Sequence, residues 1–301
     1  MNKLHIVALR TQIGTSDMLS QKSWLTLQEA CANSHETEEI LQIAKEVLPP
    51  NDAETVAICF EHLDDVSSEL DKYADIGIIA LTELDEDFPK KFSSTLQTKS
   101  PTVLFASGRT ELLNAECIGI VGSRNATDDE LEFARETARV SCREGFVIVS
   151  GGARGIDQAA MCAAFESGGG CIGFLADSLA TTTKKMRNEL DSESFCIASP
   201  YSPDAGFSVG NAMGRNKLIY GNTIATVVVT SDLGKGGTWA GAIEALSMQS
   251  TRVIVADGEN APEGNRKLIS KGAISLKSPS NLLEAITHSE QKSEPQQSSL
   301  F

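Results

Sequence analysis

The feature that most constrains the fold is an alternation, from about residue 76 onward, of short apolar runs with helical stretches. The apolar runs are GIIALT, PTVLFASG, CIGIVGS, FVIVSGG, GCIGFLA, FCIAS, ATVVVTS and RVIVADG, and most of them stop at glycine, serine or aspartate. Segments such as DDELEFARETARVSCREG and GIDQAAMCAAFESGG between them have a helical pattern. Near-continuous apolar strands separated by helices are typical of a parallel sheet that is covered on both faces. The pattern predicts an α/β fold, an extended Rossmann-like, doubly wound and mainly parallel sheet.

The segment before this alternation is helical in character. Apolar residues recur at helical spacing in 20–48, Pro49-Pro50 stops that pattern, and a second amphipathic piece follows. At about 150 residues per domain, 301 residues suggest two domains. We therefore expect an acidic helical accessory domain over 1–74, a Rossmann-like domain over 75–283, and a flexible polar tail over 284–301.

Several functional classes are excluded at this stage. No run approaches the ~18 apolar residues of a membrane span, and the N-terminus lacks the apolar core of a secretion signal, so we expect a cytoplasmic protein without membrane contact. The seven cysteines contain no C-x-x-C pair and the four histidines do not cluster with them. Neither a metal site, a disulfide framework nor a cofactor is expected.

The net charge of −15 is distributed unevenly along the chain. Residues 1–116 contain nine basic and twenty acidic residues, whereas 117–277 contain sixteen and eighteen. A strongly acidic protein is steered away from nucleic acid at long range. The nearly neutral middle of the chain can nevertheless carry a local basic patch.

In a doubly wound sheet, ligands bind beyond the carboxyl ends of the strands. Two predicted strands are followed by glycine and by cationic or hydroxyl side chains, which favour an anion. The residues concerned are Gly122, Ser123 and Arg124 after CIGIV, and Ser150, Gly151, Gly152, Arg154, Gly155 and Asp157 after FVIV. For Asp157 the capping of the next helix is favoured over contact with a ligand.

Two later segments add to this set. Arg215, Asn216 and Lys217 are expected at the head of an apolar helix, and Lys235, Gly236, Gly237 and Thr238 form a second glycine-rich turn. Neither turn matches the phosphate loop of nucleotide hydrolases or the dinucleotide fingerprint. Four such segments at one edge of one sheet predict a phosphate-binding site.

The succession GIVGSR, IVSGGARGID, GRNKLIYGN, a glycine-rich turn after ATVVV, and LISKGA resembles the DNA-processing protein A family, DprA or Smf, over about 76–276. The resemblance implies an extended Rossmann fold that binds single-stranded DNA, forms a homodimer and loads the recombinase RecA in DNA recombination or natural transformation. Backbone contacts are implied for Ser123, Arg124, Gly151, Arg154, Arg215 and Lys217. Lys184 and Lys185, expected in a loop, would be secondary contacts.

A related nucleotide-binding branch offers an alternative. Its LOG-type phosphoribohydrolases carry P-G-G-x-G-T-x-x-E, whereas here Gly241 stands three residues after Thr238 and Glu244 lies one turn further on. No catalytic residue is therefore predicted, and the alternative function is a non-catalytic or weakly catalytic nucleotide-binding protein.

A third hypothesis is a protein-recruiting adaptor. Gln297, Leu300 and Phe301 at the C-terminus look like the peptide with which bacterial proteins engage the DNA polymerase sliding clamp. Two apolar anchors and a glutamine amide suit such a pocket, although a pattern this short also arises by chance. The acidic N-terminal third can dock on a basic partner, but solubility is the favoured explanation of its charge.

Overall fold

The computed structural model describes residues 1–248 and 251–287, and its centre is one nine-stranded sheet in the order β1-β2-β6-β5-β4-β3-β7-β8-β9. The strands are β1 (Ile78–Thr82), β2 (Val103–Gly108), β3 (Cys117–Val121), β4 (Val147–Ser150), β5 (Cys171–Phe174), β6 (Phe195–Ser199), β7 (Ala225–Val228), β8 (Arg252–Ala256) and β9 (Ile274–Leu276). β2 runs antiparallel to both of its neighbours, β1 and β6. All strands from β6 to β9 in the sheet order above run parallel to one another. The predicted α/β fold with a mainly parallel sheet is confirmed.

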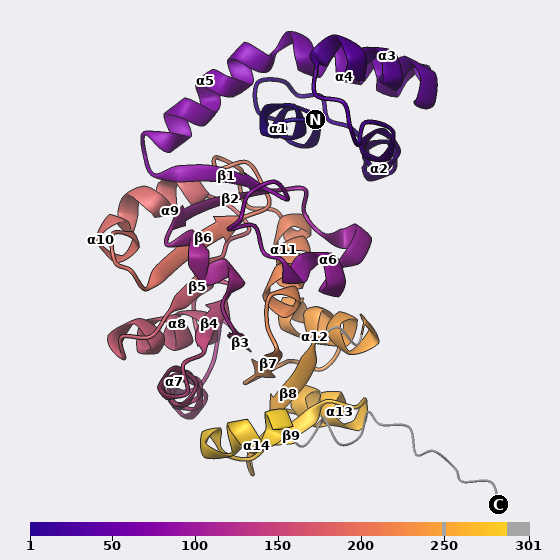
Figure 1. Ribbon diagram of the computed structural model, residues 1–301. Helices are drawn as coiled ribbons and strands as arrows, with labels where there is room; N and C mark the ends of the chain where they lie inside the picture. Colours follow the sequence, from indigo (N-terminus) through magenta and orange to yellow (C-terminus); the bar gives the residue numbers. More distant parts are fainter. Residues whose placement is uncertain (249–250, 288–301) are drawn as a thin grey trace, which may run out of the picture.

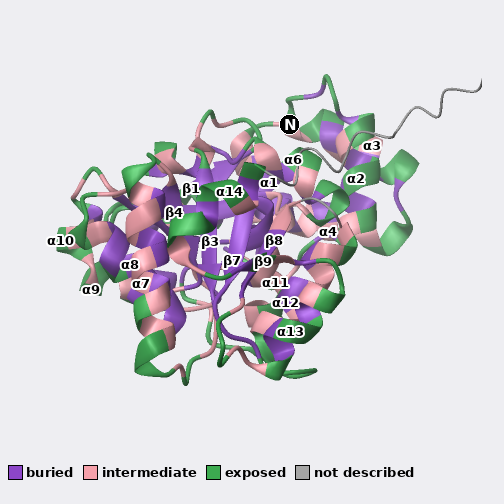
Figure 2. Cartoon of the chain, turned by 90° about the horizontal axis from the view of Figure 1, so that it is seen from below, coloured by how far each residue is buried: buried purple, intermediate pink, exposed green. Residues whose placement is uncertain are grey.

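Helices cover both faces of this sheet. α7 (Asp128–Arg143) and α8 (Ile156–Glu166) lie on one face, and α11 (Val209–Gly221), α12 (Gly236–Met248) and α13 (Glu263–Ser270) lie on the other (Figure 1). Seen from below, the strands form a buried centre between the two groups of helices (Figure 2). Alternate residues of a strand enter opposite cores, as Ile118 packs in the cluster of α7 and α8 and Cys117 in that of α11 and α12.

The sequence around α7 shows why these helices begin and end where they do. Thr127 and Glu130 form a capping box, in which the Glu130 carboxylate accepts a 2.8 Å hydrogen bond from the Thr127 amide. Asp128 in the first turn and Arg143 in the last turn complement the helix dipole. Gly145 then takes a φ of +84°, which ends the helix and turns the chain toward β4.

The N-terminal third is helical, as predicted. It consists of α1 (Lys3–Arg10), α2 (Gln21–Ala30), α3 (Thr37–Val47), α4 (Pro50–Glu61) and α5 (Leu63–Ala74). α3 ends before Pro49, and Pro50 occupies the first position of α4, where a proline needs no amide donor. α1 was not predicted.

These helices share one hydrophobic cluster with the β1 and β2 end of the sheet and with the face covered by α7 and α8. Tyr73 of α5 packs edge-on against Phe105 of β2, with ring centroids 6.5 Å apart. Lys3 of α1 forms a 2.9 Å ion pair with Asp85 in the loop after β1. The helical segment is therefore attached to the sheet by both apolar and polar contacts.

The remaining elements are short: α6 (Lys91–Thr95), α9 (Leu179–Lys185), α10 (Arg187–Leu190), α14 (Leu282–Thr287) and the 3₁₀ turns Gln97–Lys99, Thr110–Asn114 and Pro279–Asn281. In the described part of the chain, no helix has the length and apolar character needed to cross a bilayer. Gln297, Leu300 and Phe301, predicted to bind the sliding clamp, lie outside the described residues. The division into domains at residues 74 and 283 stays a prediction.

Candidate functional site

The carboxyl ends of β3, β4 and β7 meet at one edge of the sheet, with β3 between the other two. The chain continues from β3 toward β4 on one side, while β7 pairs with β3 on the other, so this is the point where the strand order reverses. Such a point leaves a crevice between the loops. A crevice of about 630 Å³ lies here, bordered by the loops after β3 and β7, by α11 along most of its length and by the first turn of α12.

The loop between β4 and α8 is organised by a buried carboxylate. The Asp157 side chain accepts a 3.1 Å hydrogen bond from the Gly151 amide and further bonds from the amides of Ala153 and Gly122. Burial raises the pKa of Asp157, and the nearby Arg215 guanidinium and these amides oppose that shift. The prediction that Asp157 caps α8 is wrong, because Gly155 is the N-cap residue and Asp157 instead fixes the glycine loop.

Arg215 differs most from its sequence-based interpretation. It lies in the middle of α11, since that helix begins at Val209 with Ser208 as its cap. Its side chain is only 6% exposed, and one terminal nitrogen donates a 2.7 Å hydrogen bond to the carbonyl oxygen of Phe174. Burial lowers the pKa of Arg215, against the influence of Asp157. Arg215 therefore supports the site as a buried side chain. Its Nε atom has no hydrogen-bond partner.

Lys217 is also in the middle of α11 and not at its head. Its ammonium group lies 3.6 Å from the carboxylate of Glu244, which also binds Lys99 at 3.0 Å. Lys217 does not line the crevice. The structure thus joins this cation to a partly exposed cluster of charges beside the site.

The loop after β7, residues 234–238, is the second glycine loop. It lies across the crevice from the first glycine loop, which joins β4 to α8. Gly234 and Gly236 take φ values of +70° and +80°, so a residue with a Cβ atom would be strained at either position. Lys235 between them is exposed. The amide side chain of Asn216 donates a 3.1 Å hydrogen bond to the carbonyl oxygen of Gly237, which fixes the loop to α11.

Three predicted cations do reach the surface around this edge. Arg124, Arg154 and Lys235 are exposed, and no carboxylate of the described residues lies within ion-pair distance of any of them. The Arg124 guanidinium lies 5.9 Å from the ring centroid of Phe207, a cation–π arrangement. The edge can therefore attract an anion although the protein as a whole is acidic.

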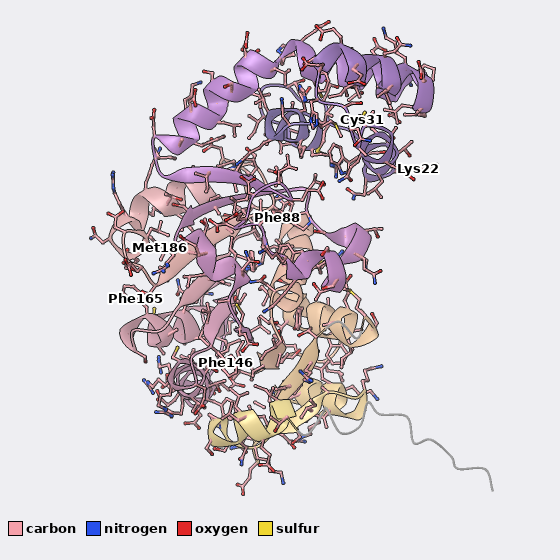
Figure 3. All side chains as sticks on the ribbon, viewed as in Figure 1. Lys22, Cys31, Phe88, Phe146, Phe165 and Met186 are labelled. Carbon is pink, nitrogen blue, oxygen red and sulfur yellow. The ribbon has the colours of Figure 1, made fainter. Side chains whose placement is uncertain are left out.

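The other predicted residues divide into three groups. Gly122, Ser123 and Thr238 line the crevice together with Arg124, while Gly151 and Gly152 line a second cavity of about 520 Å³ (its wall residues Phe165 and Met186 are labelled in Figure 3). Ser150 is buried and donates a 2.6 Å hydrogen bond to the carbonyl oxygen of Ile120. Lys184 and Lys185 end helix α9 and do not lie in a loop; both are exposed and line neither cavity.

Phe207 and Tyr220 are aromatic residues that the sequence offers for stacking near the site, but sequence reasoning missed the rest of an apolar rim and the burial of two hydroxyl groups. Phe207, Val209 and Met213 border the crevice and are 59%, 69% and 48% exposed. The hydroxyls of Tyr220 and Ser231, two further lining residues, are buried without a hydrogen-bond partner. Large apolar residues between glycine and serine in GFSVGNAM were the available signal for the rim, whereas nothing in the sequence indicated the hydroxyls.

Together the fold and the site define a Rossmann-like protein in which two glycine loops and unpaired cations lie at one edge of the sheet. The family model described as DNA recombination-mediator protein A matches residues 79–287. The chain belongs to that family.

Individual relatives agree with this assignment. The DNA processing protein DprA of Bacillus subtilis is 29% identical over 221 residues, which cover 71% of this chain and 73% of the relative. Protein Smf of Escherichia coli is 27% identical over 207 residues, which cover 66% of this chain and 54% of Smf. This chain therefore matches only about half of the Smf sequence.

Two solved structures are similar as well. DprA of Streptococcus pneumoniae superimposes with a TM-score of 0.76 at 22% identity, covering 94% of this chain and 98% of that one, and shows the same fold. DprA of Helicobacter pylori superimposes with a TM-score of 0.59 at 26% identity, covering 70% and 96%. The latter structure describes the single-stranded DNA binding mode of the H. pylori protein.

Proposed function

We propose that this chain binds single-stranded DNA at the edge formed by the two glycine loops and acts as a recombination mediator. The observation that carries the proposal is the set of exposed cations Arg124, Arg154 and Lys235, none of which has a carboxylate of the described residues within ion-pair distance. Other exposed cations of the described residues, Lys184 and Lys185 among them, also lack an ion pair, so the position of these three is what matters. Three that remain available at the ligand-binding edge of a Rossmann-like sheet favour a phosphodiester backbone.

The rim of the crevice favours a single strand over a duplex. Phe207, Val209 and Met213 present apolar surface directly beside Arg124. Unpaired bases expose aromatic faces that pack on such side chains, whereas a duplex keeps its bases stacked inside. The single-stranded DNA binding of the H. pylori relative supports this choice of ligand.

We assign binding to this site without a catalytic step. Gly241 occupies the position at which LOG-type hydrolases carry their glutamate. Glu244 is held by Lys99 and Lys217 in an ion-pair cluster outside the crevice. A carboxylate held outside the crevice is not placed to protonate a leaving group bound within it.

Fluorescence polarisation with a labelled 30-mer single strand and the matching duplex, at low salt, tests the proposal. We expect micromolar or tighter binding of the single strand, weaker binding of the duplex, and at least a tenfold loss for Arg124→Ala with Lys235→Ala. Arg109→Gln is the matched control, because Arg109 is paired with Glu193 and lies away from the crevice. Absence of binding by the wild-type protein, or an equal loss in the control, would refute the proposal.

The mediator role needs a second assay. We propose that the bound strand is passed to a recombinase of the RecA class. In a strand-exchange reaction with DNA covered by a single-strand-binding protein, the wild-type chain should shorten the lag and the Arg124 variant should not. The homodimer implied by the resemblance stays a prediction, which light scattering of the full chain checks.

A free nucleotide is the second candidate ligand. The crevice of about 630 Å³ suits a mononucleotide, and two of its lining residues, Tyr220 and Ser231, have buried hydroxyls without a hydrogen-bond partner. Competition in the same polarisation assay separates the two: a nucleotide that displaces the strand at a lower concentration than an unlabelled oligonucleotide favours the sensor. The adaptor hypothesis stays a prediction.

A further inference from the structure

A groove of about 480 Å³ between α7 and α8 continues from the crevice through Arg124. Its charged lining consists of Arg124, Arg135 and Arg154 against the single carboxylate of Glu166. The rest of its lining is mostly small, with Ala126 in the loop before α7, Ala159 and Ala163 on α8, and Gly155 at the start of α8. The groove is thus open and carries two more positive than negative side chains.

Arg124 borders three recesses, and their charges differ. The crevice carries Arg124, Arg215 and Lys235 against Asp157 and Asp232. The second cavity carries Arg124 and Arg215 against Glu166, Asp177 and Glu189. The groove therefore has the largest excess of positive side chains, and the second cavity has an excess of negative ones. A phosphodiester chain leaving the crevice is attracted to the groove and repelled from the second cavity.

We propose that the single strand runs from the crevice over Arg124 into the groove between α7 and α8, where Arg154 and Arg135 bind its phosphates. This inference rests on the proposed function and adds the direction of the strand and Arg135 as a further contact. Arg154 has no carboxylate of the described residues within ion-pair distance. Its position before the first turn of α8 places it at the mouth of the groove.

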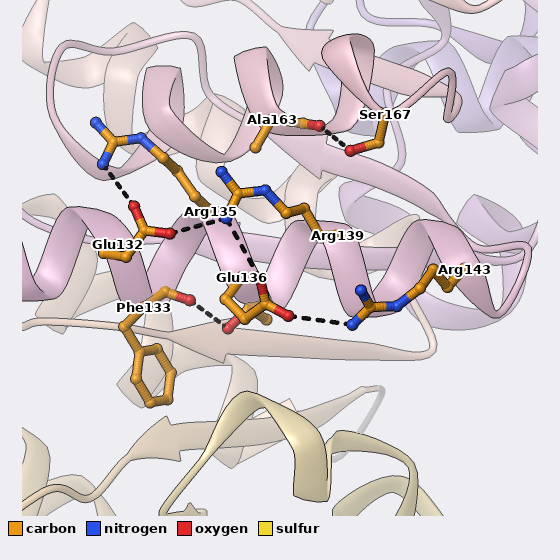
Figure 4. A network of polar contacts seen from close by, with 9 residues as sticks. Glu132, Phe133, Arg135, Glu136, Arg139, Arg143, Ala163 and Ser167 are labelled. Atoms are coloured by element: carbon orange, nitrogen blue, oxygen red, sulfur yellow. Dashed lines mark hydrogen bonds and ion pairs between the residues drawn. The ribbon is translucent and has the colours of Figure 1, made fainter.

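Arg135 belongs to a ladder of exposed ion pairs on α7 (Figure 4). It donates to Glu132 at 3.1 Å, and the other oxygen of Glu132 binds Arg139 at 2.8 Å. Glu136 binds Arg139 at 3.3 Å and Arg143 at 3.1 Å. Exposed pairs of this kind contribute little stability and exchange readily, so a phosphate can replace Glu132 as the partner of Arg135. Arg139 and Arg143 do not line the groove.

The salt dependence of DNA binding tests this path. Each lost phosphate contact reduces the slope of log Kd against log salt concentration by about 0.7 for a single strand. We expect Arg135→Gln and Arg154→Gln each to reduce the slope by that amount and to weaken binding several-fold at low salt. Arg143→Gln on the same helix is the matched control, expected to keep the wild-type slope.

Removal of the competing carboxylate gives a test in the opposite direction. Glu132→Gln frees Arg135 and should tighten binding at least threefold at low salt. Glu144→Gln changes the net charge equally at the far end of α7, outside the groove, and should have a much smaller effect. Tighter binding by Glu132→Gln alone cannot result from a folding defect.

The outcomes separate the path from the function. If the wild-type chain binds and Arg124→Ala weakens it, but Arg135→Gln and Glu132→Gln bind like wild type, the strand does not use the groove and the proposed function stands. If the wild-type chain does not bind single strands, the proposed function fails first. Equal changes for the Arg135 and Arg143 variants would show a general charge effect and would overturn the path.

Discussion

The hydroxyl of Thr238, in the first turn of α12, donates a 3.1 Å hydrogen bond to the carbonyl oxygen of Gly122 at the end of β3. The bond joins the loop after β3 to the second glycine loop across a separation of 116 residues, and both segments line the crevice. Thr238→Val keeps the shape and removes the donor. We expect about a fivefold loss of affinity for single-stranded DNA, the equivalent of one hydrogen bond of roughly 1 kcal/mol.

Thr238→Ser keeps the hydroxyl and is the control for that variant. Polarisation titrations of the three proteins should place the serine variant close to wild type. Unchanged affinity of the valine variant would mean that the loops keep their spacing without this bond.

Gly151 is required by the close approach of Arg215. A Cβ atom at residue 151 would overlap the Arg215 guanidinium and lie 2.6 Å from the Asp157 carboxylate. Gly151→Ala therefore pushes Arg215 off the carbonyl of Phe174, and we expect the free energy of unfolding to fall by roughly 1–3 kcal/mol. Urea denaturation measures it. Gly258→Ala is the control, because no atom lies within 4 Å of its Cβ position; equal losses in both variants would contradict the explanation.

Because Arg215 is buried, we expect its substitution to lower the free energy of unfolding. Arg215→Met removes the hydrogen bond to Phe174 and leaves the Asp157 carboxylate buried without its nearby cation, so we expect a loss of about 3 kcal/mol. Arg124→Met, at an exposed position, should change stability by less than about 0.5 kcal/mol while it weakens DNA binding. Thermal melts and polarisation assays on both variants distinguish the two roles. Normal melting of Arg215→Met with lost binding would instead make Arg215 a direct contact.

The ion pair between Lys3 and Asp85 predicts a pH dependence. Burial alone would raise the pKa of Asp85, but hydrogen bonds from Lys3 and Thr82 outweigh it and lower the pKa. The contribution of Asp85 to stability is therefore fully present above its unfolded pKa of about 3.9 and is lost as the pH falls through the folded pKa. The difference in urea midpoint between wild type and Asp85→Asn should be largest at neutral pH and disappear in acid.

Lys3→Met should show the same dependence, because it removes the other partner of the pair. Both side chains are partly exposed, so the effect at neutral pH should be about 1 kcal/mol or less. A difference that persists unchanged at the lowest pH would assign the effect to packing and not to charge.

The strands could be predicted because parallel strands are buried on both faces. Every residue from Cys117 to Val121 is buried, and so is every residue from Phe195 to Ser199. The reversed direction of β2 could not be predicted, since the apolar run of an antiparallel buried strand looks the same. β9 was missed because three residues, with Ser275 exposed, give no pattern.

The sequence predicted which residue types lie at the site better than it predicted their positions and partners. Glycines and hydroxyls at the ends of strands identified the edge, and the edge follows from topology alone. The start of α11 was misplaced, because Gly210 and Gly214 lower the helix propensity of a segment that Ser208 caps. The partners of Arg215 and Lys217 come from distant segments, Phe174 and Glu244, and no local pattern can reveal them.

The hydrophobic cluster that joins the N-terminal helices to the end of the sheet has a consequence for how the molecule comes apart. Ile78 and Phe105 of β1 and β2 lie in the same cluster as Trp24 of α2 and Val56 of α4. If those helices alone unfolded, the apolar residues at that end of the sheet would be exposed to water, which is unfavourable in free energy. Calorimetry of the whole chain should accordingly record one cooperative transition, and a fragment that begins at residue 75 should aggregate.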